Sequence, residues 1–291
     1  MVGGGPAGLE AARALGARGY EVALADRRSE LGGRVDAESR LPGLAEWGRV
    51  KDWRVSQINK MDNVSVYLES EIDSLQIQEY GAECVALATG ARWRHDGIGR
   101  WHETEIEGWR NASVLTPDDL FVGGEIQGSA LIYDDDFYYM GGVLAEMIAL
   151  KGIPVRLVTP ESSVSPWTRN TEEQRRVQKR LIELGVGIEA NSVLEALSPS
   201  QAHLACAFTG RERIVEAQTV VMVTSRKPND SLYLSLDESP EIIRIGDCLA
   251  PGTIAASVRS GYRYAQELDA DKSDPGQGTV PFLRETPELF G

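Results

Sequence analysis

Hydrophobic positions along the first and last parts of the chain follow two different spacings. Leu9, Ala12 and Leu15 recur at helical spacing, and the apolar run Val22–Ala25 after them predicts a parallel strand. The apolar runs at 85–91 and 242–247 predict two further buried strands, and a helix is expected at 254–268. Strands that alternate with helices predict one α/β unit built from both ends of the chain.

The middle of the chain repeats this alternation. Strands are expected at 130–133, 155–158 and 220–223, helices at 143–150 and 171–184, and a hairpin at 203–208 and 214–217. Thr171 and Gln174 fit a capping box, and Gly185 fits a helix end. The fold class expected is therefore α/β, with two Rossmann-like domains, the second inserted into the first. Residues 1–123 and 236–291 would form the discontinuous first domain, and 124–235 the inserted second domain.

A glycine motif stands at the start of the first unit. Gly3, Gly5 and Gly8 satisfy G-x-G-x-x-G, in which the glycines allow a tight turn, a close approach of a pyrophosphate, and close helix–strand packing. Pro6 suits the first turn of the helix that follows. Asp26, at the end of the second strand, stands where a ribose hydroxyl would be held. A glycine-rich turn without a ligand remains the alternative.

Three later segments extend the predicted site. The residues 30–34 read Glu-Leu-Gly-Gly-Arg, in which Arg34 offers a guanidinium suited to phosphate. The residues 88–90 read Ala-Thr-Gly at a strand end, and Gly246-Asp247 ends the last strand, with Asp247 a ribose or ribityl acceptor or else a capping residue. The candidate cofactor contacts are Gly3, Gly5, Pro6, Ala7, Gly8, Asp26, Arg27, Gly33, Arg34, Ala88, Thr89, Gly90, Gly246, Asp247, Thr253 and Ile254.

The corresponding loop of the middle unit has a different chemistry. Asp134 and Asp136 occupy the places of the first two glycines, and the aromatic run Phe137-Tyr-Tyr follows them. A like-charge contact near 4 Å would oppose a pyrophosphate by roughly 1–4 kcal/mol. Capping of the next helix is the alternative role for these acids. Their number would also suit Mg²⁺, but aromatic and apolar neighbours follow at once, so no Mg²⁺ site is expected. NAD(P)H is not expected to bind here.

Composition narrows the remaining function classes. A net charge of −14 opposes binding to nucleic acid or to an anionic membrane. The chain has no apolar run long enough to span a membrane and no leader pattern, so a cytoplasmic location is expected. Cys84, Cys206 and Cys248 lie far apart without a C-x-x-C pair, and the three histidines lack metal-ligand spacing. We expect no metal site and no catalytic residue within this chain.

Three segments carry a specific resemblance to a known family. They read LIYDDDFYYMGGVLAE at 131–146, VSPWTRNT at 164–171 and RIGDCLAPGTI at 244–254. Together they resemble the C-terminal part of the trimethylamine and dimethylamine dehydrogenase family, most of all its dimethylglycine and N-methylproline demethylase branch. The resemblance implies an N-terminal barrel that carries FMN and a 4Fe–4S cluster and oxidises an N-methyl amine. It also implies electron transfer to an electron-transfer flavoprotein, and FAD, or ADP in its place, at the glycine loop.

The chain departs from that family in one respect, because it contains no barrel, and its first strand is only Met1-Val2. We expect a barrel domain or subunit that carries FMN and 4Fe–4S, and an oligomeric assembly. Two other readings stay open at this point. A self-contained FAD enzyme reduced by NAD(P)H would need an intact second glycine loop, and a non-catalytic nucleotide-binding adaptor would only dock the electron-transfer flavoprotein.

Overall fold

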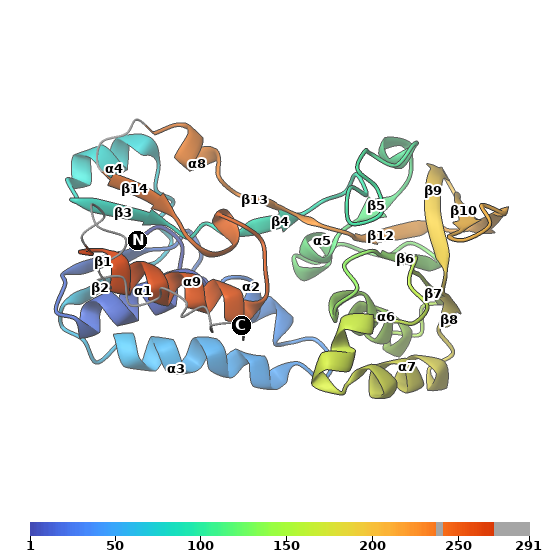
Figure 1. Cartoon of the computed structure of the whole chain (residues 1–291), viewed down its shortest axis with the longest axis horizontal. Helices are drawn as coiled ribbons and strands as arrows, with labels where there is room; N and C mark the ends of the chain where they lie inside the picture. Colours follow the sequence, from blue (N-terminus) through green and yellow to red (C-terminus); the bar gives the residue numbers. More distant parts are fainter. Residues whose placement is uncertain (237–240, 271–291) are drawn as a thin grey trace, which may run out of the picture. The chain divides into compact units, whose positions relative to one another are not determined.

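The computed structural model describes residues 1–236 and 241–270, which form two compact units (Figure 1). Unit 1 comprises Met1–Ser39, Glu46–Ala91 and the described residues from Pro228 onward. Unit 2 comprises Arg40–Ala45 and Arg92–Lys227, so it takes in residues 92–123, which the sequence-based limits gave to the first domain. The predicted domain limits, 1–123 with 236–291 and 124–235, stay a prediction, and part of them lies outside the described residues.

Unit 1 is built on a parallel sheet. Strand β1 (Val22–Ala25) pairs with β2 (Val64–Tyr67), and β3 (Cys84–Leu87) pairs with β14 (Glu241–Arg244), each in parallel. Val2 joins the two pairs, because it bridges to Ala25 on one side and to Leu87 on the other. Its N–H donates to Ala86 O at 2.9 Å, and its carbonyl accepts from Ala88 N at 2.7 Å. The short first strand therefore lies in the centre of the sheet.

Helices cover both faces of this sheet (Figure 1). On one face, α1 (Pro6–Ala17), α3 (Gly48–Ile58) and α9 (Ile254–Glu267) enclose a core of alanine and leucine. The backbones of α1 and α9 touch, since a Cβ on Gly261 would lie 2.1 Å from Ala7 O. The other face packs against α4 (Ser74–Tyr80) and α8 (Ser231–Leu234). The short elements α2 (Arg34–Glu38), η1 (Ala45–Trp47) and η4 (Gly246–Cys248) lie in the connections.

Unit 2 contains a five-stranded parallel sheet in the order β5-β12-β6-β7-β8. Its strands are β5 (Val114–Leu115), β12 (Thr219–Val223), β6 (Ala130–Asp134), β7 (Val155–Val158) and β8 (Gly187–Glu189). An antiparallel sheet of β9 (Ser192–Ser198), β10 (Gln201–Cys206) and β11 (Glu212–Glu216) shares a core with it. The helical elements are η2 (Trp109–Asn111), α5 (Pro117–Phe121), α6 (Met140–Leu150), η3 (Pro166–Thr171) and α7 (Gln174–Glu183). The paired strands β4 (Ala91–Trp93) and β13 (Arg226–Pro228) lie where the chain passes between the units.

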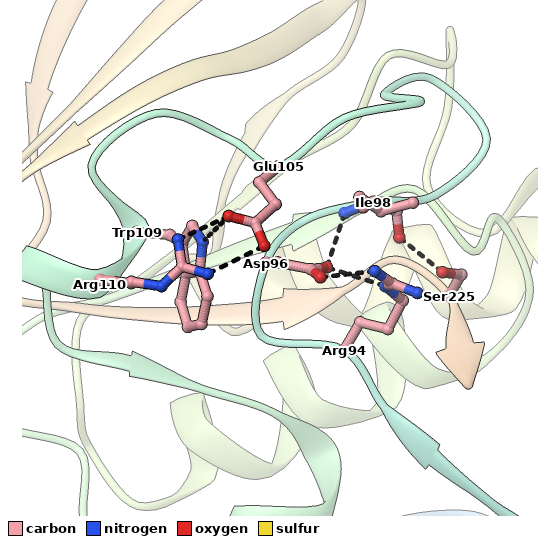
Figure 2. A network of polar contacts seen from close by, with 7 residues as sticks. All are labelled: Arg94, Asp96, Ile98, Glu105, Trp109, Arg110 and Ser225. Atoms are coloured by element: carbon pink, nitrogen blue, oxygen red, sulfur yellow. Dashed lines mark hydrogen bonds and ion pairs between the residues drawn. The ribbon is translucent and has the colours of Figure 1, made fainter. Parts of the chain in front are cut away.

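Ion pairs order the long connection that precedes β5 in unit 2 (Figure 2). Arg94 donates two hydrogen bonds to the Asp96 carboxylate, from Nε at 2.9 Å and from Nη2 at 2.6 Å. Asp96 also accepts from Ile98 N at 3.1 Å, and Ile98 O accepts from the Ser225 hydroxyl at 2.5 Å. A second pair joins Glu105 to Arg110 and Trp109 (Figure 2). The connection is therefore preorganised by its own side chains.

Most elements expected from the sequence are present. The strands near 22, 85, 130, 155, 220 and 242, the hairpin, and the helix ended by Gly185 are all found. The capping box expected at Thr171 is wrong, because Thr171 ends the 3₁₀ helix η3 and its hydroxyl bonds Thr168 O and Glu173. Helix α7 begins three residues later, at Gln174. The isolated apolar residues of α3 and β2 carried too little periodicity to predict those two elements.

Candidate functional site

The glycine loop of unit 1 joins the central Val2 to helix α1. Gly3 has φ +103, and a Cβ there would lie 2.4 Å from Ala88 O, so both conformation and space require glycine. A Cβ on Gly8 would lie 1.9 Å from Gly3 O, which enforces the close packing of helix and strand. Pro6 is the first residue of α1, as expected. Two of the three motif glycines are thus explained by packing within the protein.

Gly5 differs from its two neighbours. Its backbone is extended (φ −76, ψ −175), which any residue adopts. A Cβ there would meet only Gly33 Cα, at 4.0 Å, so the protein itself leaves this position open. Gly5 also caps the N-terminus of α1, where free N–H groups and the helix dipole favour an anion. The observation fits a glycine that a close ligand requires, although nucleotide binding itself stays a prediction.

Asp26 contributes to this loop more directly than its motif position suggests. Its Oδ2 accepts from Gly4 N at 2.6 Å and its Oδ1 from Arg28 N at 2.8 Å, and the side chain is buried. The carboxylate therefore fixes the shape of the glycine loop, and a ribose hydroxyl would use its remaining lone pairs. Arg27 points elsewhere: it is half exposed and lies 3.8 Å from Glu71.

The second glycine segment lies against the first. A Cβ on Gly33 (φ +58) would stand 2.9 Å from Gly5 Cα, and Gly32 N donates to Gly4 O at 2.8 Å. Arg34 begins α2, donates from Nη2 to Ala91 O at 2.8 Å, and lies 3.8 Å from Glu38. The guanidinium is mostly buried and is held near the carboxyl end of β3, the edge where ligands of open α/β sheets bind.

The remaining predicted residues gather at the same edge of the unit 1 sheet. Thr89 donates from Oγ1 to Asn229 O at 2.6 Å and lies 3.0 Å from Cys248 Sγ. Asn229 donates from its backbone to Gly90 O at 2.9 Å, so it braces the Ala-Thr-Gly turn. Asn229 and Cys248 were not among the predicted residues, although both stand in segments whose neighbours were.

The start of helix α9 completes the site. Asp247 Oδ1 accepts from Gly252 N at 3.0 Å and from the Ser257 hydroxyl at 2.9 Å. Thr253 caps the helix by accepting from Ala256 N, and Ile254 is its first residue. Gly246 (φ +61) places its missing Cβ 2.5 Å from the Ala7 Cβ, which brings this segment against the first turn of α1. Asp247 therefore has the turn-forming role that was its alternative, and a ligand role is not tested by these contacts.

The equivalent loop of unit 2 is filled by protein. Asp134, the last residue of β6, is fully buried, and its Oδ2 lies 2.4 Å from where a Cβ on Gly141 would stand. Burial, together with the nearby carboxylates Asp136 and Asp135, raises the pKa of Asp134 to about 8. The side chain that replaces a motif glycine thus occupies the space beside the first turn of α6, where a phosphate would have to lie.

The described residues contain neither a candidate metal site nor a candidate membrane-spanning helix. Within residues 1–236 and 241–270, no three His, Cys, Asp or Glu side chains converge in a way that could hold a metal ion. The same residues contain no helix that is both long enough and apolar enough to cross a membrane. The three cysteines are all free.

Comparison with known proteins places this site in a family. Residues 1–69 match the NAD(P)-binding Rossmann-like domain. The chain is 30% identical to dimethylamine dehydrogenase from Hyphomicrobium sp. (strain x), over 98% of this chain and 43% of that protein. It is 28% identical to the probable N-methylproline demethylase of Rhizobium meliloti (strain 1021), over 91% of this chain and 38% of that protein. The solved structure of histamine dehydrogenase from Rhizobium sp. 4-9 is 41% identical, with a TM-score of 0.89, over 93% of this chain and 43% of that chain.

The fold and the glycine loop are those of a Rossmann-like nucleotide-binding protein, and the relatives that this chain matches are oxidoreductases. More narrowly, the chain is homologous to part of the trimethylamine and dimethylamine dehydrogenase family, as its Asp-rich loop and Gly-Asp segment predicted. The chain spans about two fifths of the length of the relatives described above. It is therefore similar to one region of those proteins, and the activity of the whole protein has to be inferred.

Proposed function

We propose that this chain is the nucleotide-binding portion or subunit of an iron–sulfur flavoprotein that oxidatively N-demethylates a small methylated amine. Electrons would pass to an electron-transfer flavoprotein. The observation that carries the proposal is the contrast between the two loops. Gly5 is left open at a helix N-terminus, whereas Asp134 fills the corresponding space in unit 2. One cradle can accept a dinucleotide or ADP, and the place for a nicotinamide dinucleotide is taken.

Different residues of unit 1 would bind different parts of the nucleotide. The N–H groups at the start of α1, beside Gly5, would bind the pyrophosphate. Arg34 would neutralise phosphate charge, and Asp26 would accept a hydrogen bond from a ribose hydroxyl. In FAD, the half beyond the pyrophosphate would reach Asp247 and the start of α9. A bound flavin would supply redox chemistry, while this chain's residues bind and orient it.

The amine chemistry is proposed to lie outside this chain. Relatives named as dehydrogenases and demethylases of amines are more than twice its length. A barrel domain or subunit with FMN and a 4Fe–4S cluster would fill the remainder, and the nucleotide held here would then have a structural role. The competing function is an FAD enzyme reduced by NAD(P)H, since the chain is also 26% identical to an NADH oxidase from Thermoanaerobacter brockii.

One preparation distinguishes these functions. The purified chain would be analysed by absorbance, and the nucleotide released by acid would be identified by mass. The proposal expects bound ADP or FAD, and no loss of flavin absorbance when NADH is added without oxygen. Rapid bleaching of a bound flavin by NADH would favour the NAD(P)H enzyme. A chain that carries no nucleotide and binds neither ADP nor FAD would refute the site.

A further inference from the structure

The loop between β6 and α6 contains a carboxyl that is buried without full hydrogen bonding. Asp134 Oδ1 accepts from Phe137 N at 3.1 Å, but Oδ2 has no partner and no exposed surface. Ionising such a group would leave an uncompensated charge in the interior, which is far more unfavourable than burying a neutral acid. The geometry alone therefore favours the protonated form of Asp134.

Asp135 ties the same loop to a second segment. Its Oδ2 accepts from Arg100 N at 2.6 Å and from Trp101 N at 2.9 Å, and the residue is buried. Gly99 permits this contact, because a Cβ there would lie 2.2 Å from Asp135 Oδ2. The Arg94–Asp96 ion pair holds the residues that precede this segment (Figure 2). Asp135 thus anchors the tip of an already ordered connection.

A third segment joins through the backbone of Phe137. Its carbonyl accepts from Trp167 N at 3.0 Å, and the Arg100 guanidinium lies 5.7 Å from the Phe137 ring and 5.9 Å from the Trp167 ring. The Trp101 and Trp167 side chains are 46% and 54% exposed. We name Arg100, Trp101, Phe137 and Trp167 the Arg100 surface. Three separate segments build it, and both buried acids lie at their junctions.

The ionisable groups around Asp134 do not stabilise its charge. On its own loop the neighbours are Asp136 and Asp135, which repel a negative charge and, with burial as the larger cause, raise the pKa of Asp134 to about 8. Strand β12 carries no ionisable side chain, and the acid of α6, Glu146, pairs with Arg180 at 3.0 Å. From the other packed segments, Arg169 bonds Ser163, His102 faces the Tyr133 ring, and Arg100 acts on Asp135.

We propose that Asp134 and Asp135 form a proton-dependent lock: neutral Asp134 keeps the β6–α6 loop closed and the Arg100 surface assembled, and release of its proton to solvent opens that loop. Phe137 makes the loop ready to open. It holds the left-handed conformation (φ 66), which is unfavourable for an aromatic residue. The hydrogen bond from Phe137 N to the Asp134 carboxyl is one of the contacts that keep it there. This device lies within unit 2 and is independent of nucleotide binding by unit 1.

Hydrogen exchange measured by mass spectrometry between pH 5 and 9.5 tests the lock on the intact chain. Opening that solvates Asp134 releases one proton, so its equilibrium constant should rise about tenfold per pH unit between pH 6 and 8 and then level off. After correction for the intrinsic rate, peptides covering 98–102, 135–139 and 166–168 should lose protection with this slope. Peptides covering 143–158 should not.

Asp134→Asn removes this titration while keeping the shape. Burial raises the pKa of Asp135 to about 6, so Asp135 is already ionised above pH 7, and there protection of the same peptides should become independent of pH. Glu212→Gln, the same replacement of an acid by an amide but at an exposed position of β11, should keep the full slope. Wild-type protection that follows the intrinsic rate alone up to pH 9.5 would overturn the proposal, whether or not the Asn variant folds. Nucleotide content measured in the same samples separates this outcome from failure of the unit 1 site.

Discussion

Replacing each of two motif glycines by alanine separates packing from ligand binding. At Gly8 the new Cβ would stand 1.9 Å from Gly3 O, and that backbone oxygen cannot move aside cheaply. Gly8→Ala should therefore destabilise the chain by about 1–3 kcal/mol, as overpacking does. At Gly5 the backbone already suits alanine and nothing lies closer than 4.0 Å. Gly5→Ala should change the stability of the free chain by under about 1 kcal/mol, because the gain through the unfolded state is opposed by the low preference of alanine for the N-cap.

For nucleotide affinity, Gly5→Ala is expected to be the more damaging of the two substitutions. A methyl group at Gly5 would displace a phosphate from the N–H groups of α1, and losing one hydrogen bond to a charged group is equivalent to about 1.5–3 kcal/mol, or about 10–150-fold in Kd. Urea denaturation of the nucleotide-free variants and calorimetric titration with ADP and FAD measure the two effects. Gly5→Ala binding as tightly as the wild type, or unfolding as early as Gly8→Ala, would refute this reading of the loop.

Three further changes have outcomes set by contacts within a single unit. Asp26→Asn removes one of the two charged acceptors that hold Gly4 N and Arg28 N, so the free energy of unfolding in urea should fall by about 1–3 kcal/mol, and an unchanged value would contradict that role. Glu10→Gln leaves Arg13 and Arg54 without their shared carboxylate, so the free energy of unfolding should fall by about 3 kcal/mol. The control Glu46→Gln, in an exposed pair with Arg49, should change it by under about 1 kcal/mol. Bonds from Thr209 and Phe208 lower the pKa of the Cys206 thiol to about 7, so at pH 7 iodoacetamide should modify Cys206 before the buried Cys248, and equal rates would count against those bonds.

The sequence predicted the parts of this fold that depend on local pattern. Gly3 and Gly8 predicted the strand-to-helix turn, because their close neighbours leave no room for a Cβ. The apolar run Val22–Ala25 predicted its strand, because most of its side chains are buried. Other features depend on contacts across the chain. The bond from Gly4 N to Asp26, and the bracing of Gly90 by Asn229 from 139 positions along the chain, have no local signature. Thr171 misled for the same reason, since the turn from Ser165 to Thr171 is fixed by Phe137.

The two loops differ in whether side chains leave the space at the helix N-terminus open or fill it. Both follow a parallel strand and open onto a helix N-terminus, so the helix dipole favours an anion at each. In unit 1 the acid Asp26 lies outside the loop and accepts from the Gly4 N–H, which leaves the helix end open. In unit 2 the acid Asp134 stands within the loop itself, against Gly141. An acid that supports the cradle is compatible with a bound phosphate, whereas an acid inside it takes the phosphate's place. The position of a single carboxylate relative to the helix therefore accounts for one open loop and one filled loop in the same chain.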